Sequence, residues 1–158
     1  MQQGVDAFNI LILTFTNKAA REMKERIASV VGASEAKNLW MGTFHSVFAR
    51  ILRSEADKLG FPSNFTIYDT QDSVKLIGSI IKEQGLDKER YKAKQVLSRI
   101  SQFKNSLITV KAYQNNSELQ EADTMASRPK MGTIYKEYVD RCFKSGAMDF
   151  DDLLLRTN

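Results

Sequence analysis

The sequence predicts an α/β fold that is predominantly helical, with a short parallel sheet and a helical insertion. Residues 10–15 form a continuous apolar run, which is typical of a strand buried on both faces. A polar turn and a helix-spaced stretch follow, and the same strand, turn and helix order recurs over residues 39–59. Residues 61–146 then carry mainly helical periodicity, so they are expected to form the insertion.

The first helix is expected to follow the apolar run almost at once. Thr16 or Asn17 can cap its first turn, and Gly32 can end it. Its expected buried stripe has the spacing of one helix face and consists of Ala20, Met23, Ile27 and Val30.

The second strand is expected at residues 39–43, with residues 44–46 as a turn before a helix that ends near Leu59. Three further helices are predicted in the insertion, from the Asp69 cap to Gly85, over residues 93–105, and from Met131 to Gly146. The polar stretch 109–129 is expected to be mobile or loosely helical, and Asp149 is expected to cap a last helix that begins at Phe150.

The composition excludes several classes of protein. One cysteine, Cys142, allows no internal disulfide, and with a single histidine it argues against a zinc site. No apolar run approaches ~20 residues, and the start of the chain is polar, so neither a membrane span nor a secretory signal is expected. A cytoplasmic location follows as the default. The net charge of +4 suits a polyanionic partner, although many soluble proteins carry as much.

Two polar segments follow the predicted strands, at residues 14–18 and 43–46. Ligands of open α/β sheets bind beyond the carboxyl ends of the strands, where helix N-termini favour phosphate. Phe15, Phe44 and His45 add flat rings that suit the bases of a single strand. The alternative is that the threonines are helix caps and the phenylalanines belong to the core. The residue types alone leave both interpretations open.

Three segments resemble UvrD/Rep-type superfamily 1 DNA helicases. The sequence Thr-Phe-Thr-Asn-Lys-Ala-Ala-Arg-Glu-Met-Lys-Glu-Arg-Ile at 14–27 resembles motif Ia of that family nearly letter for letter. Gly-Thr-Phe-His-Ser at 42–46, continuing to 49–53, resembles motif Ib. Asp-Phe-Asp-Asp-Leu-Leu at 149–154 resembles the segment that re-enters the first motor domain after a helical insertion.

The resemblance implies a partial RecA-like (P-loop NTPase-like) domain 1A at residues 1–60, helical subdomain 1B at 61–146, and a truncated return into 1A at 147–158. It implies contacts to single-stranded DNA from Phe15, Thr16, Asn17, Lys18, Thr43, Phe44, His45 and Arg50. For Arg50, and for Arg53, a solvated helix face is an equal alternative. Basic side chains of 1B would lie near the duplex junction, although a solvated face is the favoured interpretation for Lys92, Lys94, Arg99 and Lys104.

The resemblance implies that the chain contributes to an ATP-dependent 3′–5′ DNA helicase that acts in repair, recombination or replication. The chain contains neither a Gly-x-x-x-x-Gly-Lys-Ser/Thr P-loop nor the family's Asp-Glu-x-x motif. ATP and Mg²⁺ are therefore expected to serve the intact parent, and no catalytic, cofactor-binding or metal-binding residue is expected here. The expected partners are single-stranded DNA, a duplex junction and the remaining helicase domains.

Three alternatives remain from the sequence. The parent could be an AddA or RecB-type helicase–nuclease subunit, which carries related motifs. The chain could instead be a non-enzymatic nucleic-acid-binding or protein-interaction module. The isolated piece could also have no function of its own, and its sheet, which lacks neighbouring strands, could then self-associate through the open strand edges.

Overall fold

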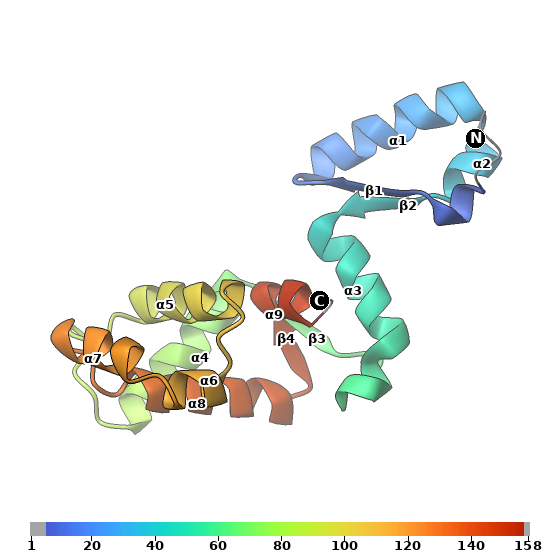
Figure 1. Ribbon diagram of the computed structural model, residues 1–158. Helices are drawn as coiled ribbons and strands as arrows, with labels where there is room; N and C mark the ends of the chain where they lie inside the picture. Colours follow the sequence, from blue (N-terminus) through green and yellow to red (C-terminus); the bar gives the residue numbers. More distant parts are fainter. Residues whose placement is uncertain (1–5, 157–158) are drawn as a thin grey trace. The chain divides into compact units, whose positions relative to one another are not determined.

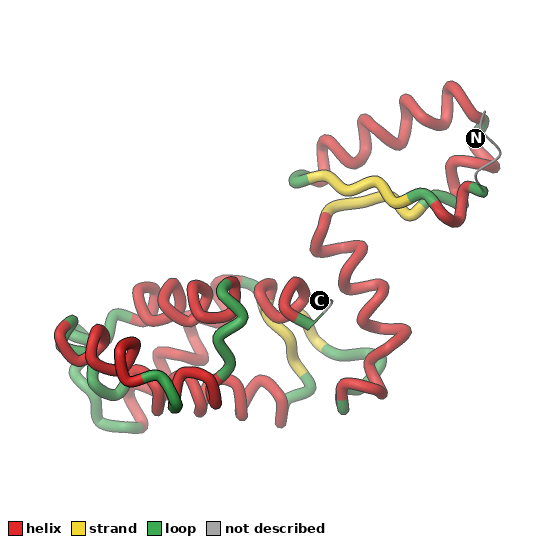
Figure 2. Tube along the Cα trace, viewed as in Figure 1, coloured by secondary structure: helices red, strands yellow, loops and turns green. Residues whose placement is uncertain are grey.

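The computed structural model describes residues 6–156, which divide into two units between Ser54 and Glu55. Helices predominate in both, and each contains a pair of short parallel strands (Figures 1 and 2). The predicted α/β, mainly helical class is therefore confirmed. Within residues 6–156 the two strand pairs form separate sheets, so the RecA-like architecture stays a prediction.

The first unit is a strand–helix–strand arrangement. Its elements in chain order are the 3-10 helix η1 (Ala7–Asn9), β1 (Leu11–Thr14), α1 (Asn17–Val31), α2 (Ala33–Lys37), β2 (Trp40–Thr43) and α3 (Phe44–Glu55). β1 and β2 pair in parallel, with Leu11 opposite Trp40 and Thr14 opposite Thr43. α1 packs along both strands, as Figure 1 shows. The predicted order of the elements is therefore correct.

Two details of the first unit differ from the prediction. Val30 was expected in the buried stripe of α1, but its side chain is 83% exposed, and no residue along α1 is fully buried. This part of the prediction is wrong because α1 has only a narrow two-stranded surface to cover. The expected turn at residues 44–46 is also wrong, because α3 begins at Phe44 directly after β2.

The second unit is a helical assembly closed by a strand pair. Its elements are the 3-10 helix η2 (Ala56–Leu59), β3 (Thr66–Tyr68), α4 (Thr70–Glu83), α5 (Ala93–Asn105), α6 (Val110–Gln114), α7 (Ser117–Met125), α8 (Met131–Lys144), β4 (Ala147–Asp149) and α9 (Phe150–Leu155). The core lies between α4, α5 and α8, and Ile80, Ile100 and Ile134 are among its fully buried residues.

Parallel pairing of β3 with β4 brings together the two ends of the helical region. Thr66 lies opposite Ala147, and Tyr68 lies opposite Asp149. Both strands run directly into capped helices. Asp69 and Asp149 accept hydrogen bonds from the backbone N–H groups of Asp72 and Asp152, and both predicted caps are confirmed as reciprocal capping boxes.

The stretch 109–129 is better ordered than its polar sequence suggested. Thr109 and Asn116 cap the short helices α6 and α7. Tyr113 is buried, and its hydroxyl donates to Asp123, which also accepts a bond from Arg99 at 3.0 Å. The expected loose segment is thus two short helices anchored to α5. The interpretation of Arg99 as part of a solvated helix face is wrong, because its guanidinium pairs with the buried carboxylate of Asp123.

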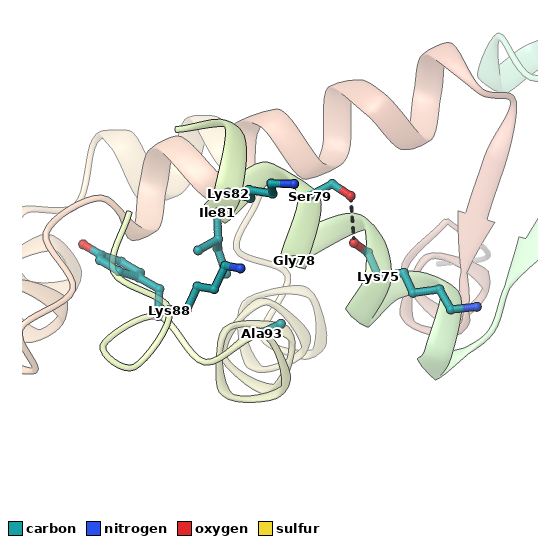
Figure 3. Close-up of a pocket in the computed structure, with 8 residues that line it drawn as sticks. Lys75, Gly78, Ser79, Ile81, Lys82, Lys88 and Ala93 are labelled. Carbon is teal, nitrogen blue, oxygen red and sulfur yellow. Dashed lines mark hydrogen bonds between the residues drawn. The ribbon is translucent and has the colours of Figure 1, made fainter. Parts of the chain in front are cut away.

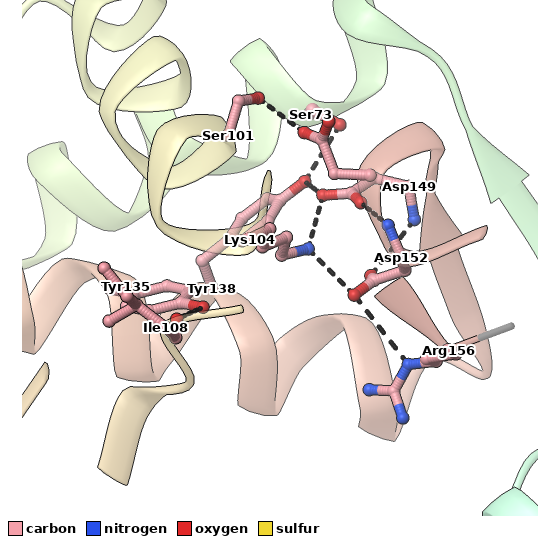
Figure 4. A network of polar contacts seen from close by, with 10 residues as sticks. Ser73, Ser101, Lys104, Ile108, Tyr135, Tyr138, Asp149, Asp152 and Arg156 are labelled. Carbon is pink, nitrogen blue, oxygen red and sulfur yellow. Dashed lines mark hydrogen bonds and ion pairs between the residues drawn. The ribbon is translucent and has the colours of Figure 1, made fainter. Parts of the chain in front are cut away.

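Lys104 is buried in the second unit. Its side chain is 2% exposed, and its ammonium nitrogen lies 2.7 Å from Asp149 Oδ2 and 3.0 Å from Asp152 Oδ1 (Figure 4). The Tyr138 hydroxyl also donates to Asp149, at 2.8 Å. Lys104 was assigned to a solvated face or to contacts with a duplex, and both interpretations are wrong. Instead, Lys104 connects α5 to β4 and α9.

The two carboxylates respond differently to this environment. Burial alone would raise the pKa of Asp149, but Lys104 and the hydrogen bonds from Lys104, Asp152 and Tyr138 outweigh burial and hold this pKa below its ordinary value. Burial raises the pKa of Asp152, and Lys104 only partly opposes it. Burial would lower the pKa of Lys104, but the two carboxylates keep it above its ordinary value.

Replacing Lys104 with methionine is expected to destabilise the second unit by about 3–5 kcal/mol, because two buried carboxylates lose their shared cation. Urea denaturation followed by helical circular dichroism measures this change. Lys94→Met is the matched control, because Lys94 is exposed on the same helix, and it should change stability by less than about 0.5 kcal/mol.

The Lys104→Met defect is expected to shrink at acid pH. Asp149, with its lowered pKa, contributes stability above the ordinary carboxyl pKa, and this contribution is lost as pH falls through the folded value. The variant can protonate its unpaired carboxyls, so the two proteins converge. A defect that stayed constant from neutral to acid pH would contradict this account of Lys104.

Candidate nucleic-acid interface

The register of β1 and β2 brings the two predicted polar segments to one edge of the sheet. Thr14 and Thr43 are paired residues at the ends of parallel strands, so the residues that follow them emerge side by side. The rings of Phe15 and Phe44 lie 5.3 Å apart between centroids, tilted by 40°. The structure thus joins two segments that are far apart in the sequence.

Phe15 presents its ring to solvent, with 90% of the residue exposed. Phe44 is half-buried and also contacts Phe48, one turn further along α3, with 6.0 Å between ring centroids. As the first residue of α3, Phe44 therefore contacts both Phe15 and Phe48, and it supports the exposed Phe15 ring from one side. The interpretation of Phe15 as a core residue is wrong.

The hydroxyl of Thr16 caps α1. Its Oγ1 accepts a hydrogen bond from the Ala19 backbone N–H at 3.1 Å. Thr14 supports this turn by donating its hydroxyl to the Thr16 carbonyl at 3.2 Å. The capping interpretation is correct for Thr16, and the capped first turn of α1 points its partial positive charge at the same edge as Phe15.

Thr43 and Ser46 form a small hydroxyl cluster at the start of α3. Thr43 Oγ1 donates to Ser46 Oγ at 3.1 Å, and Ser46 Oγ donates to the Thr43 carbonyl at 2.9 Å. A Cβ atom at Gly42 would lie 2.5 Å from Ser46 Oγ, which is closer than atoms approach without a shift. Gly42 therefore leaves room for the cluster that ends β2.

Further polar side chains lie around this edge. Asn17 and Lys18 are exposed in the first turn of α1, and Lys18 has only a long ion pair with Glu22 at 3.9 Å. His45 is exposed in the first turn of α3. A phosphate at this edge would meet two helix N-termini and the charge of Lys18, whose side chain is 88% exposed.

Arg50 lies further along α3. Its guanidinium carbon is 4.3 Å from the centroid of the Trp40 ring, in a cation–π contact. The contact holds Arg50 against β2 while the residue remains exposed, so it is not simply a side chain extended into solvent. Arg50 is therefore oriented, but it lies away from the Phe15 and Phe44 pair along the helix.

The structure adds Trp40 to the residues predicted for this edge, as the surface on which Arg50 rests. Thr14 and Ser46, which belong to the predicted polar segments, form the internal hydrogen bonds of the edge. A strand-terminal threonine and a serine three residues after another threonine are recognisable signals of such turns. No signal in the sequence indicated that Trp40 and Arg50 would meet, because their contact depends on how α3 leaves β2.

The described residues offer little for other kinds of site. Across 6–156 there is no group of three or more His, Cys, Asp or Glu side chains arranged to hold a metal ion. No helix in that range is long and apolar enough to cross a membrane. Burial raises the pKa of the Cys142 thiol to about 12, so this cysteine stays protonated inside the second unit.

Comparison with known proteins gives one consistent family. The family model described as "UvrD/REP helicase N-terminal domain" matches residues 1–158. The "ATP-dependent DNA helicase PcrA" of Staphylococcus epidermidis strain ATCC 35984 is 40% identical over 156 residues, which is 99% of this chain and 20% of that protein. The same-named protein of Staphylococcus aureus strain Mu50 is 38% identical over the same coverage.

The chain thus spans about a fifth of the length of these curated relatives. The match covers the segments at 14–27, 42–53 and 149–154 together with everything between them. The resemblance drawn from those segments is confirmed, and the chain belongs to the UvrD/REP helicase N-terminal domain family.

Proposed function

We propose that this chain supplies part of the single-stranded DNA track of an ATP-dependent helicase that moves 3′ to 5′ along one strand. The observation that carries the proposal is the contact between Phe15 and Phe44 at the ends of two parallel strands. The relatives of this chain are named ATP-dependent DNA helicases, which supports the choice of motor and substrate.

The roles at this edge follow from its chemistry. A base stacks on the exposed ring of Phe15, and Phe44 keeps that ring in place from behind. The adjoining phosphates lie toward the N-termini of α1 and α3, where Lys18 adds charge. Because stacking and phosphate contacts are independent of base identity, this arrangement suits a motor that must accept any sequence.

His45 and Arg50 extend the same track along α3. His45 adds a second planar side chain in the first turn, and Arg50 presents a guanidinium that Trp40 holds against the sheet. Thr16 and Thr43 contribute mainly through the two turns that they shape. Asn17 presents its exposed amide at the first position of α1. The proposed order along the strand is therefore Phe15 and Lys18 first, then His45, with Arg50 further out.

The proposed subdomains are 1A at residues 1–60 and 147–158, and 1B at 61–146. β3 pairs with β4, so the chain enters and leaves the helical region at adjacent points, as an insertion requires. The described residues themselves divide between Ser54 and Glu55, and the return segment packs with the helical region. In the full-length helicase, motor residues outside this chain bind ATP and Mg²⁺. The edge that carries Phe15 and Phe44 moves together with those residues.

Single-strand binding tests the track. Fluorescence anisotropy of a labelled oligothymidylate, titrated at low and moderate salt, is expected to show binding that weakens steeply with salt. Phe15→Ala should weaken binding about tenfold, because one stacking surface is lost. Lys18→Ala combined with His45→Ala should reduce both the affinity and the salt dependence.

Lys37→Ala is the matched control for charge. Lys37 is exposed at the end of α2, before β2 begins, so it lies at the opposite end of the strand from Thr43. The Lys37→Ala variant should bind the oligothymidylate as tightly as the unsubstituted chain does. Equal losses in Lys37→Ala and Phe15→Ala, or full binding by Phe15→Ala, would argue against the proposed track.

The chain on its own is expected not to hydrolyse ATP, because its 158 residues include no P-loop to surround the phosphates. A phosphate-release assay with and without single-stranded DNA checks this expectation. A blank preparation purified in parallel is the control. DNA-stimulated hydrolysis that stays with the chain through purification would refute the assignment of ATP chemistry to other parts of the parent.

A further inference from the structure

A pocket of about 450 Å³ lies in the second unit, beside α4. One wall is the face of α4 that carries Lys75, Gly78 and Lys82, and the other is the segment from Lys88 to Ala93 that leads into α5 (Figure 3). None of these residues takes part in the candidate nucleic-acid interface, which lies in the first unit. The pocket is therefore a separate feature to explain.

The rim of the pocket is basic. Lys75, Lys82 and Lys88 are exposed, and no acidic side chain is among the lining residues. Lys75 and Lys82 are seven residues apart on one face of α4, and Figure 3 shows Gly78 between Lys75 on one side and Lys82 and Lys88 on the other. Within residues 6–156 these three lysines form no ion pair shorter than 4.0 Å, in contrast to buried Lys104.

The floor of the pocket is apolar. Ile81 and Tyr91 are buried, with 1% and 4% exposed, and Ala93 lies beside them. The Tyr91 hydroxyl accepts a hydrogen bond from the Lys130 backbone N–H at 3.0 Å, which ties the tyrosine to the start of α8. Because Ile81, Ala93 and the Tyr91 side chain line this floor, an apolar group suits it best.

Gly78 is the residue that the fold itself does not explain. It lies inside α4, where glycine is less favourable than alanine, and an added Cβ would meet nothing within 4 Å. Gly132 in α8 is different, because a Cβ there would lie 2.5 Å from the Tyr113 ring. Packing requires glycine at position 132, whereas at position 78 glycine only keeps the pocket open.

We propose that this pocket docks an acidic segment of a partner protein, with one apolar side chain placed over Gly78 and carboxylates placed at Lys75, Lys82 and Lys88. Charge complementarity selects an acidic partner, and the apolar floor selects a peptide over a nucleic acid. A single strand held by its bases would need an exposed ring for stacking, and the one aromatic lining residue, Tyr91, is buried. The inference is independent of the proposed helicase function.

Titration of the 158-residue chain with a fluorescein-labelled peptide of aspartates and glutamates around a central Leu-Phe pair tests the proposal. The unsubstituted chain should bind this peptide. Lys75→Glu combined with Lys82→Glu should weaken binding at least about tenfold. Gly78→Leu should also weaken binding about tenfold, because the new side chain occupies the apolar space. Its melting temperature should nevertheless stay the same or rise by about 2–4 °C, since leucine favours the helix.

The controls separate this site from general attraction between charges. Lys111→Glu combined with Lys144→Glu makes the same charge change at exposed positions that do not line the pocket, and binding should be nearly unchanged. A peptide with Ser-Ser in place of Leu-Phe should bind at least about fivefold more weakly.

Three results would overturn the proposal. One is an absence of peptide binding by the parent chain. Another is equal weakening in the pocket and control charge variants. The third is a duplex oligonucleotide that displaces the peptide and itself depends on Gly78, which would make the pocket a nucleic-acid site instead.

Discussion

Parallel strand pairing determines where the chemically important residues of both units lie. Antiparallel strands would send their carboxyl ends in opposite directions, whereas parallel strands end together. In the first unit this constraint brings Phe15 beside Phe44. In the second unit it brings β4 beside β3 and so places Asp149 at the core, where Lys104 reaches it. The contact between the two phenylalanines and the buried ion cluster therefore share one cause.

The buried cluster differs in kind from the surface charges. Lys104 lies within hydrogen-bonding distance of the buried carboxylates of Asp149 and Asp152. Because burial removes all three groups from water, each charge is stabilised by the others. The Lys18–Glu22 pair is exposed and long, and contributes little to the fold. The exposed ammonium group of Lys18 can therefore bind a ligand. The buried ammonium group of Lys104 instead connects α5, β4 and α9.

Much of this arrangement was predictable from the sequence, and the failures have physical causes. The strand–helix order, both aspartate caps and the helix over Ala93–Asn105 follow from apolar spacing and capping chemistry, which are local. Burial is not local. Lys104 has the sequence context of a surface lysine, and only the return of the chain at residue 149 buries it. The error at Val30 is the opposite one. Val30 was predicted to be buried but is exposed, because the apolar stripe of α1 has too little sheet to cover. The DNA-contact roles at the candidate interface rest on family likeness and on the ring geometry.

The contact between Arg50 and Trp40 has a spectroscopic consequence. Trp40 is the only tryptophan in the chain, and it lies in β2 with a guanidinium over its ring. Indole emission depends on the charge and solvent next to the ring, so a phosphate that drew Arg50 away would alter the fluorescence of the unlabelled protein. The fluorescence of Trp40, in the strand that positions the candidate interface, should therefore report whether a ligand is bound at that interface.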